Sequence, residues 1–123
     1  MFRREDCVQF DPSLRIAEDL EWWIRMWDRG EFAWSDEPGL VIRHHTTPRV
    51  ETNDDTRFRS KIAVLERHRH LLARDPKSYA NHLRRAGSAA YLARCRRTTI
   101  SLAIQSLWAS PSTPAIGLLA RAL

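Results

Sequence analysis

Apolar side chains recur at helical spacing soon after a turn near the N-terminus. Ile16, Leu20, Trp23 and Trp27 occupy positions i, i+4, i+7 and i+11, which predicts a helix that Gly30 ends. Acidic residues open this segment and arginines close it, an order that suits the helix dipole. We therefore expect a short amphipathic helix whose aromatic stripe faces a core.

The pattern changes to that of strands after this helix. Residues 32–35 alternate between apolar and polar positions, and residues 40–45 run from β-branched and apolar to polar. A turn-forming segment, residues 36–39, separates them. The sequence thus predicts a short β-hairpin or strand pair in a chain that is otherwise mainly α-helical.

Helical patterns return after a polar segment and fill the rest of the chain. Several N-cap residues precede a helix that presents Phe58, Ile62, Leu65 and Leu72 on one face and ends near Arg74. We expect residues 53–123 to form a helical tail of three to four helices that includes a helical hairpin. Residues 1–52 then form a separate unit.

Local signals set the expected boundaries within the tail. Asp75 and Pro76 are typical of a helix start, and the helix that follows carries a stripe made of Tyr79, Leu83, Ala86 and Ala90. The next helix is expected to be capped by Thr98 or Thr99, with Ile100, Ala103, Ile104, Leu107 and Trp108 facing inward. Thr113 and Pro114 open a final short helix.

The charge of the chain widens the choice of partners without selecting one. The 123 residues carry a net charge of +5, and the excess is arginine, which permits contact with anionic lipids, phosphorylated substrates or nucleic acid. The basic positions concentrate late in the chain, at Arg84, Arg85, Arg94, Arg96 and Arg97. They form either a solvated helix face or a basic interaction module that binds a partner protein or an anionic surface. No nucleic-acid partner is expected, because no DNA-reading helix with a flanking turn is recognisable.

Cysteine usage and hydropathy bear on the compartment. Cys7 and Cys95 are far apart and have no metal-ligand spacing, which is typical of a reduced, intracellular protein. The sequence shows neither a signal peptide nor an apolar run of membrane-spanning length. A cytoplasmic location is expected.

Two groups of residues could carry chemistry. Glu18 and Asp19 lie at the start of the first predicted helix, where free N–H groups and the helix dipole keep a carboxylate ionised, as a general base requires. The alternative is ordinary acidic decoration of a helix start. Arg43, His44 and His45 follow the second predicted strand and could hold a phosphate or a divalent metal. The alternative is a set of exposed loop residues, and we interpret His68, His70 and His82 as surface residues.

The order of these features resembles a known family. Over about 44 residues the chain carries, in this order, Phe2-Arg3-Arg4-Glu5, Phe10-Asp11-x-x-Leu14, Glu18-Asp19-x-Glu21-x-Trp23-x-Arg25, Gly30-Glu31, Pro38 and Arg43-x-His45. This arrangement resembles the C-terminal half of the catalytic domain of family 2 glycosyltransferases, which have the GT-A fold and usually invert the transferred sugar. The resemblance implies a partial α/β GT-A domain over residues 1–52.

The resemblance also implies roles for individual residues. Asp19 corresponds to the base that deprotonates the acceptor hydroxyl, and Glu18 to the acid before it. Trp22 and Trp23 correspond to positions that shape the acceptor side. Arg43 and His45 correspond to positions near the metal and the diphosphate, with His44 as the alternative if the register differs by one.

The family's donor-binding features are missing from the sequence. It contains neither the nucleotide-binding turn nor an Asp-x-Asp motif. We therefore expect a fragment, a truncated reading frame or half of a split glycosyltransferase, of the hexosyltransferase type and inactive alone. The complete enzyme would use a nucleotide-sugar donor, a glycan or lipid-linked acceptor and Mn²⁺ or Mg²⁺, the metal being implied for that enzyme and not necessarily for this chain. Such an enzyme could attach peripherally to the inner membrane face.

Overall fold

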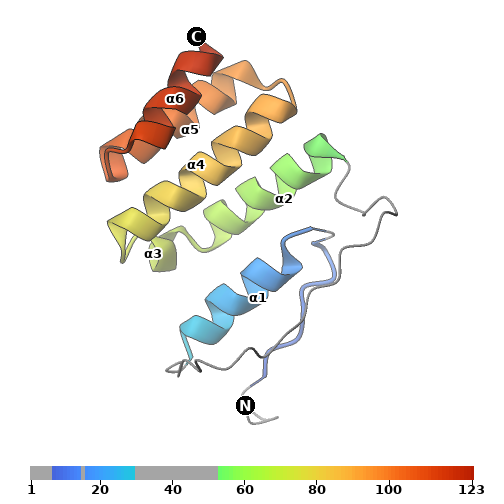
Figure 1. Cartoon of the computed structure of the whole chain (residues 1–123). Coiled ribbons are helices and arrows are strands. Elements are labelled where there is room, and N and C mark those ends of the chain that lie inside the picture. Colours follow the sequence, from blue (N-terminus) through green and yellow to red (C-terminus); the bar gives the residue numbers. More distant parts are fainter. Residues whose placement is uncertain (1–6, 15, 30–52) are drawn as a thin grey trace, which may run out of the picture.

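The computed structural model describes residues 7–14, 16–29 and 53–123, and its helices stack side by side (Figure 1). In chain order they are α1 (Glu18–Trp27), α2 (Asp54–Arg67), α3 (Arg69–Leu72), α4 (Pro76–Leu92), α5 (Arg96–Ala109) and α6 (Thr113–Ala122). Helix α4 is central, because it contacts α2 and α3 as well as α5 and α6. Helix α1 lies beyond α2, on the side of the stack away from α5 and α6 (Figure 1).

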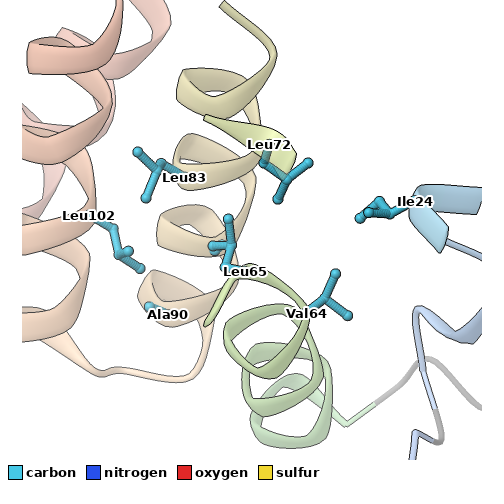
Figure 2. Packing of buried hydrophobic residues seen from close by; sticks show 8 residues of the cluster. Ile24, Val64, Leu65, Leu72, Leu83, Ala90 and Leu102 are labelled. Carbon is cyan, nitrogen blue, oxygen red and sulfur yellow. The ribbon is translucent and has the colours of Figure 1, made fainter. Parts of the chain in front are cut away.

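The expected α/β character is wrong. The described residues form helices with no strand and no sheet, so over these residues the expected GT-A-like mixed architecture is corrected to an all-helical one. The packing of α1 shows the difference, because in the described structure this helix lies against other helices and not against a sheet. Its Ile24 instead belongs to a cluster with Val64 of α2 and Leu72 of α3 (Figure 2). The predicted strands at residues 32–35 and 40–45 lie outside the described residues.

Several helix boundaries follow the predicted turn chemistry. The Asn53 side chain caps α2 by accepting a hydrogen bond from the Thr56 N–H at 3.1 Å. Asp75 caps α4, and Pro76 occupies the first turn. These predictions are confirmed, as is the start of α6 at Thr113.

Other boundaries differ from the prediction. The helix expected to reach Arg74 is interrupted at His68, which ends α2 and precedes the short α3. Helix α5 begins at Arg96, before the predicted threonine caps. Thr99 is instead fully buried, and its hydroxyl donates to the Cys95 carbonyl at 3.1 Å. A threonine inside a helix can bond back to the preceding turn in this way, which the sequence pattern does not distinguish from capping.

Small residues bring α4 and α5 close together in the core. The predicted inward positions Leu83, Ala86 and Ala90 are buried, whereas Tyr79 is half-buried. On α5 the predicted face is partly wrong. Ala103 is buried as predicted and Ile100 and Leu107 are half-buried, but Ile104 and Trp108 are exposed. The other buried positions of α5 are Thr99, Leu102 and Ser106. A hydrogen bond explains the inward serine, because the Ser106 hydroxyl donates to the Ala80 carbonyl of α4 at 2.8 Å.

Replacing each of the two glycines of the tail with alanine is expected to change the stability of the fold in opposite directions. A Cβ atom at Gly87 would lie 2.9 Å from Cδ2 of the buried Leu118 and 3.4 Å from Cβ of Leu102, whereas one at Gly117 would meet only the end of Arg121 at 3.9 Å. We expect Gly87→Ala to lower the free energy of unfolding by about 1 kcal/mol, since crowding outweighs the gain in helix propensity. Gly117→Ala, the matched control, should raise it by about 0.5–1 kcal/mol. Urea unfolding followed by circular dichroism measures both, and equal effects would contradict the close packing at Gly87.

None of the helices in the described parts of the chain combines the length and the apolar character needed to cross a lipid bilayer.

Candidate functional site

The predicted base lies at an exposed helix start. Glu18 and Asp19 occupy the first turn of α1, after Ala17 in a left-handed conformation with φ 66°. Asp19 is exposed, and its Oδ1 accepts a hydrogen bond from the Leu20 N–H at 2.7 Å. Glu18 is half-buried. The carboxylate of Asp19 is therefore near the positive end of the helix dipole and open to a substrate.

The two adjacent tryptophans have different environments. The Trp22 indole N–H donates to the Val8 carbonyl at 2.7 Å, and its ring stacks on Phe10 with centroids 5.7 Å apart. Trp23 meets Trp22 edge-on, with centroids 5.2 Å apart, and its side chain is 47% exposed. Trp22 thus anchors the N-terminal segment to α1, while Trp23 is left at the surface.

The exposure of the aromatic stripe corrects one expectation. Trp23 and Trp27 were expected to be core residues, but Trp27 is 67% exposed. The buried face of α1 is rotated toward Glu21, Ile24 and Met26. Asp19, Trp23 and Trp27 succeed one another at four-residue intervals, so they form one outward stripe along α1.

A groove of about 360 Å³ runs beside this stripe, between α1 and the α3–α4 region. Leu20, Trp23, Ile24, Trp27, Leu71 and Leu72 give it an apolar lining, and Asp28, Arg74, Asp75, Ser78 and His82 give it polar groups. The Arg74 side chain spans it by donating to Asp28 at 3.0 Å. Burial, and then the positive charges of Arg85 and Lys61, lower the pKa of His82. The lowered pKa favours the neutral imidazole, which can both donate and accept a hydrogen bond.

An ionic network centred on a buried glutamate lies on the other side of α1. Glu21 is 1% exposed. Its Oε2 accepts a hydrogen bond from the Nε–H of Arg25 at 2.9 Å, and its Oε1 lies 3.0 Å from Nε2 of His68, itself buried. Nη1 of Arg67 lies 3.8 Å from Oε1 of Glu21, and the same guanidinium forms an ion pair with Asp11. We call Asp11, Glu21, Arg25, Arg67 and His68 the Glu21 network.

The Glu21 network fixes α1 and the segment before it to α2. Arg25 donates to the Gln9 carbonyl at 2.6 Å as well as to Glu21. Hydrogen bonds from Ser13, and then Arg67, lower the pKa of Asp11 to about 2, so this carboxylate is charged at neutral pH. The network thus holds in place the helix that carries Asp19 and Trp23.

Sequence reasoning missed this network. It placed Glu21 off the apolar stripe and interpreted His68 as a surface residue, and both are buried. One local signal was available, since Glu21 and Arg25 are spaced for an ion pair on one helix face. His68 is 47 residues from Glu21 in sequence, and no local pattern connects them.

The other predicted site residues cannot be placed. Arg43, His44 and His45 lie outside the described residues. Within the described ranges no group of three or more His, Cys, Asp or Glu side chains is arranged to hold a metal ion. The site that the structure does describe is therefore the groove. Asp19 does not line it, but lies one helical turn before Trp23 on the same face of α1.

Comparisons with known proteins give no relative for this chain. No family model matches it, and neither the curated proteins nor the solved structures contain a match.

Proposed function

We propose that the groove beside α1 binds a saccharide, and that the chain supplies the acceptor side of a sugar-transfer reaction with Asp19 as general base. The observation that supports this most is the outward stripe of α1. It combines one exposed carboxylate, Asp19, with two exposed indole rings, Trp23 and Trp27, at the edge of a groove.

The lining of the groove suits a sugar ring. A pyranose has apolar C–H faces and a polar edge of hydroxyl groups, so its binding site needs flat apolar surface and a few hydrogen-bonding groups. Trp23 and Trp27 offer flat apolar surface, and Ser78 and His82 offer hydrogen-bonding groups. The neutral state of His82 favours uncharged hydroxyl groups over an anionic ligand.

The proposed step is a displacement at the donor sugar. Asp19 takes the proton of the acceptor hydroxyl as that oxygen forms a bond to the anomeric carbon, and the bond from this carbon to the nucleoside diphosphate breaks. A carboxylate that is oriented by a hydrogen bond and exposed to solvent can act in this way. Glu18, half-buried beside it, helps to set the local charge.

Binding of the donor belongs to the nucleotide-binding half whose motifs the sequence lacks. Mn²⁺ or Mg²⁺ with Arg43 and His45 remains part of the proposal for the complete enzyme. The described residues offer no metal site, so we assign no step to the metal. In the same proposal the complete enzyme uses a nucleotide-sugar donor and a glycan or lipid-linked acceptor on the cytoplasmic side.

Loss of Trp23 is expected to weaken saccharide binding by about tenfold or more, because the ring contributes much of the apolar face of the groove. The chain would be titrated with methyl glycosides and with maltose, cellobiose and lactose, and binding followed by saturation-transfer NMR. Trp108→Ala is the matched control, since this tryptophan is exposed on α5, outside the groove. Absence of binding by every sugar, or equal binding by Trp23→Ala and Trp108→Ala, would contradict the proposal.

A further inference from the structure

The charges of the chain are divided sharply along its length. Residues 76–123 contain seven basic side chains and no acidic one, whereas residues 1–75 contain thirteen basic and fifteen acidic side chains. Residues 76–123 comprise α4, α5 and α6, which pack together. The part of the molecule formed by α4, α5 and α6 therefore carries a strong positive charge, while the basic and acidic residues of positions 1–75 nearly balance.

Helix α5 turns an amphipathic stripe toward the solvent. Arg97, Ser101, Ile104 and Trp108 are exposed and lie at positions i, i+4, i+7 and i+11, so they share one face. Trp108 is 85% exposed and Ile104 is 41% exposed. The opposite face of α5 is buried through Leu102, so this stripe is not the side of α5 that stabilises the fold.

A second surface that combines basic and apolar side chains lies at the N-terminal end of α5. The turn between α4 and α5 and the end of α6 enclose a hollow lined by Tyr91, Leu92, Arg94, Arg96, Arg121 and Leu123, together with Ala122. Arginines therefore alternate with exposed apolar side chains there, since Tyr91, Leu92 and Leu123 are all exposed. Arg96 donates to the Ala122 carbonyl at 2.7 Å, while Arg94 is exposed on the turn, where its φ is 58°.

We propose that the α5 stripe and the adjacent arginine hollow dock the protein on an anionic lipid surface. Trp108 and Ile104 enter the region between headgroups and acyl chains, where tryptophan is favoured. Arg94 and Arg97 lie against the lipid phosphates, and the acid-free segment adds long-range attraction to a negative membrane. This inference does not depend on saccharide binding by the groove.

The apolar part of the surface distinguishes lipid from other anionic partners. Non-specific binding of a duplex nucleic acid comes essentially from positive charges against its phosphates, and this mode gives no role to Ile104 and Trp108 side by side. An interfacial helix requires both a basic and an apolar component on the side that meets the membrane. The α5 stripe has both.

Vesicle sedimentation tests the proposal on the chain itself. We expect binding to mixed phosphatidylcholine–phosphatidylglycerol vesicles, little binding to pure phosphatidylcholine, and progressive release as sodium chloride screens the charges. Equal binding to both vesicle types would overturn the electrostatic argument. Tighter binding to a short DNA duplex than to anionic vesicles would replace lipid by nucleic acid as the partner.

Substitutions separate the two components of the surface. Trp108→Ala should weaken binding to anionic vesicles by roughly tenfold, and the double substitution Arg94→Ala/Arg97→Ala by tenfold or more. Trp27→Ala and Arg69→Ala remove an exposed tryptophan and an exposed arginine elsewhere, and vesicle binding should not change. Unaltered binding by Trp108→Ala with a native circular dichroism spectrum would refute the proposed surface.

Discussion

Replacing Glu21 with alanine is expected to lower the free energy of unfolding by about 3 kcal/mol. The carboxylate is almost completely buried and is held by Arg25 and His68. Its removal leaves the buried His68 without its partner and the half-buried Arg25 with only its hydrogen bond to the Gln9 carbonyl. Removing one partner of a buried polar interaction is among the most destabilising changes. Urea unfolding followed by tryptophan fluorescence and circular dichroism measures the loss.

Glu66 provides the matched control for this substitution. It is an exposed glutamate within α2, so Glu66→Ala should change stability by no more than about 0.5 kcal/mol. His68→Ala should also destabilise, and the double substitution with Glu21→Ala should cost less than the two single changes together, because both remove one interaction. A loss below about 1 kcal/mol for Glu21→Ala would show that the Glu21 network does not hold α1 in place.

Asparagine at position 19 is expected to reduce sugar transfer by a factor of about 10²–10⁴, because an amide cannot accept the proton of the acceptor hydroxyl. The substitution preserves the shape of the side chain, and Asp19 is exposed with a local hydrogen bond to Leu20. Stability should therefore change little. Transfer from a nucleotide sugar is measured after the chain has been combined with a nucleotide-binding half, and acceptor binding is measured in parallel.

Asp55→Asn serves as the control for Asp19→Asn, since it removes an exposed carboxylate that pairs with Arg59 on α2. It should leave transfer unchanged. Near-normal transfer by Asp19→Asn would exclude Asp19 as the base. A loss of transfer that follows a loss of acceptor binding would assign Asp19 a binding role in place of a catalytic one.

The helices were predictable where their signals are local. Asn53 and Asp75 cap helices through N–H groups two or three residues away, and Pro76 fits only a helix start in this context. Such effects depend on a few neighbouring residues, so the sequence alone indicates them. The faces of α1 and α5 were predicted less well, because aromatic residues normally indicate a core and here several lie at the surface.

The candidate site also has a part that the local sequence predicts and a part that only the tertiary structure shows. The sequence places Asp19 and Trp23 on one side of a helix, since four-residue spacing is sufficient for that. It cannot show that the groove beside Trp23 is completed by Arg74, in the turn between α3 and α4, and by His82 of α4, which are 51 and 59 residues away in sequence. The expected strands and the predicted Arg43 and His45 positions lie outside the described residues, and their roles stay predictions.

The amino-acid sequence by itself determined where most of the tail helices begin, that the last 48 residues are free of acidic side chains, and that Asp19 and two tryptophans share a helix face. The tertiary structure alone decided that Glu21 and His68 are buried together and that Trp23, Trp27 and Trp108 are exposed. Burial depends on which surface of another helix covers a residue, and that surface comes from distant parts of the chain. A local pattern fixes the direction of a side chain around its own helix, but it cannot fix what the side chain meets there.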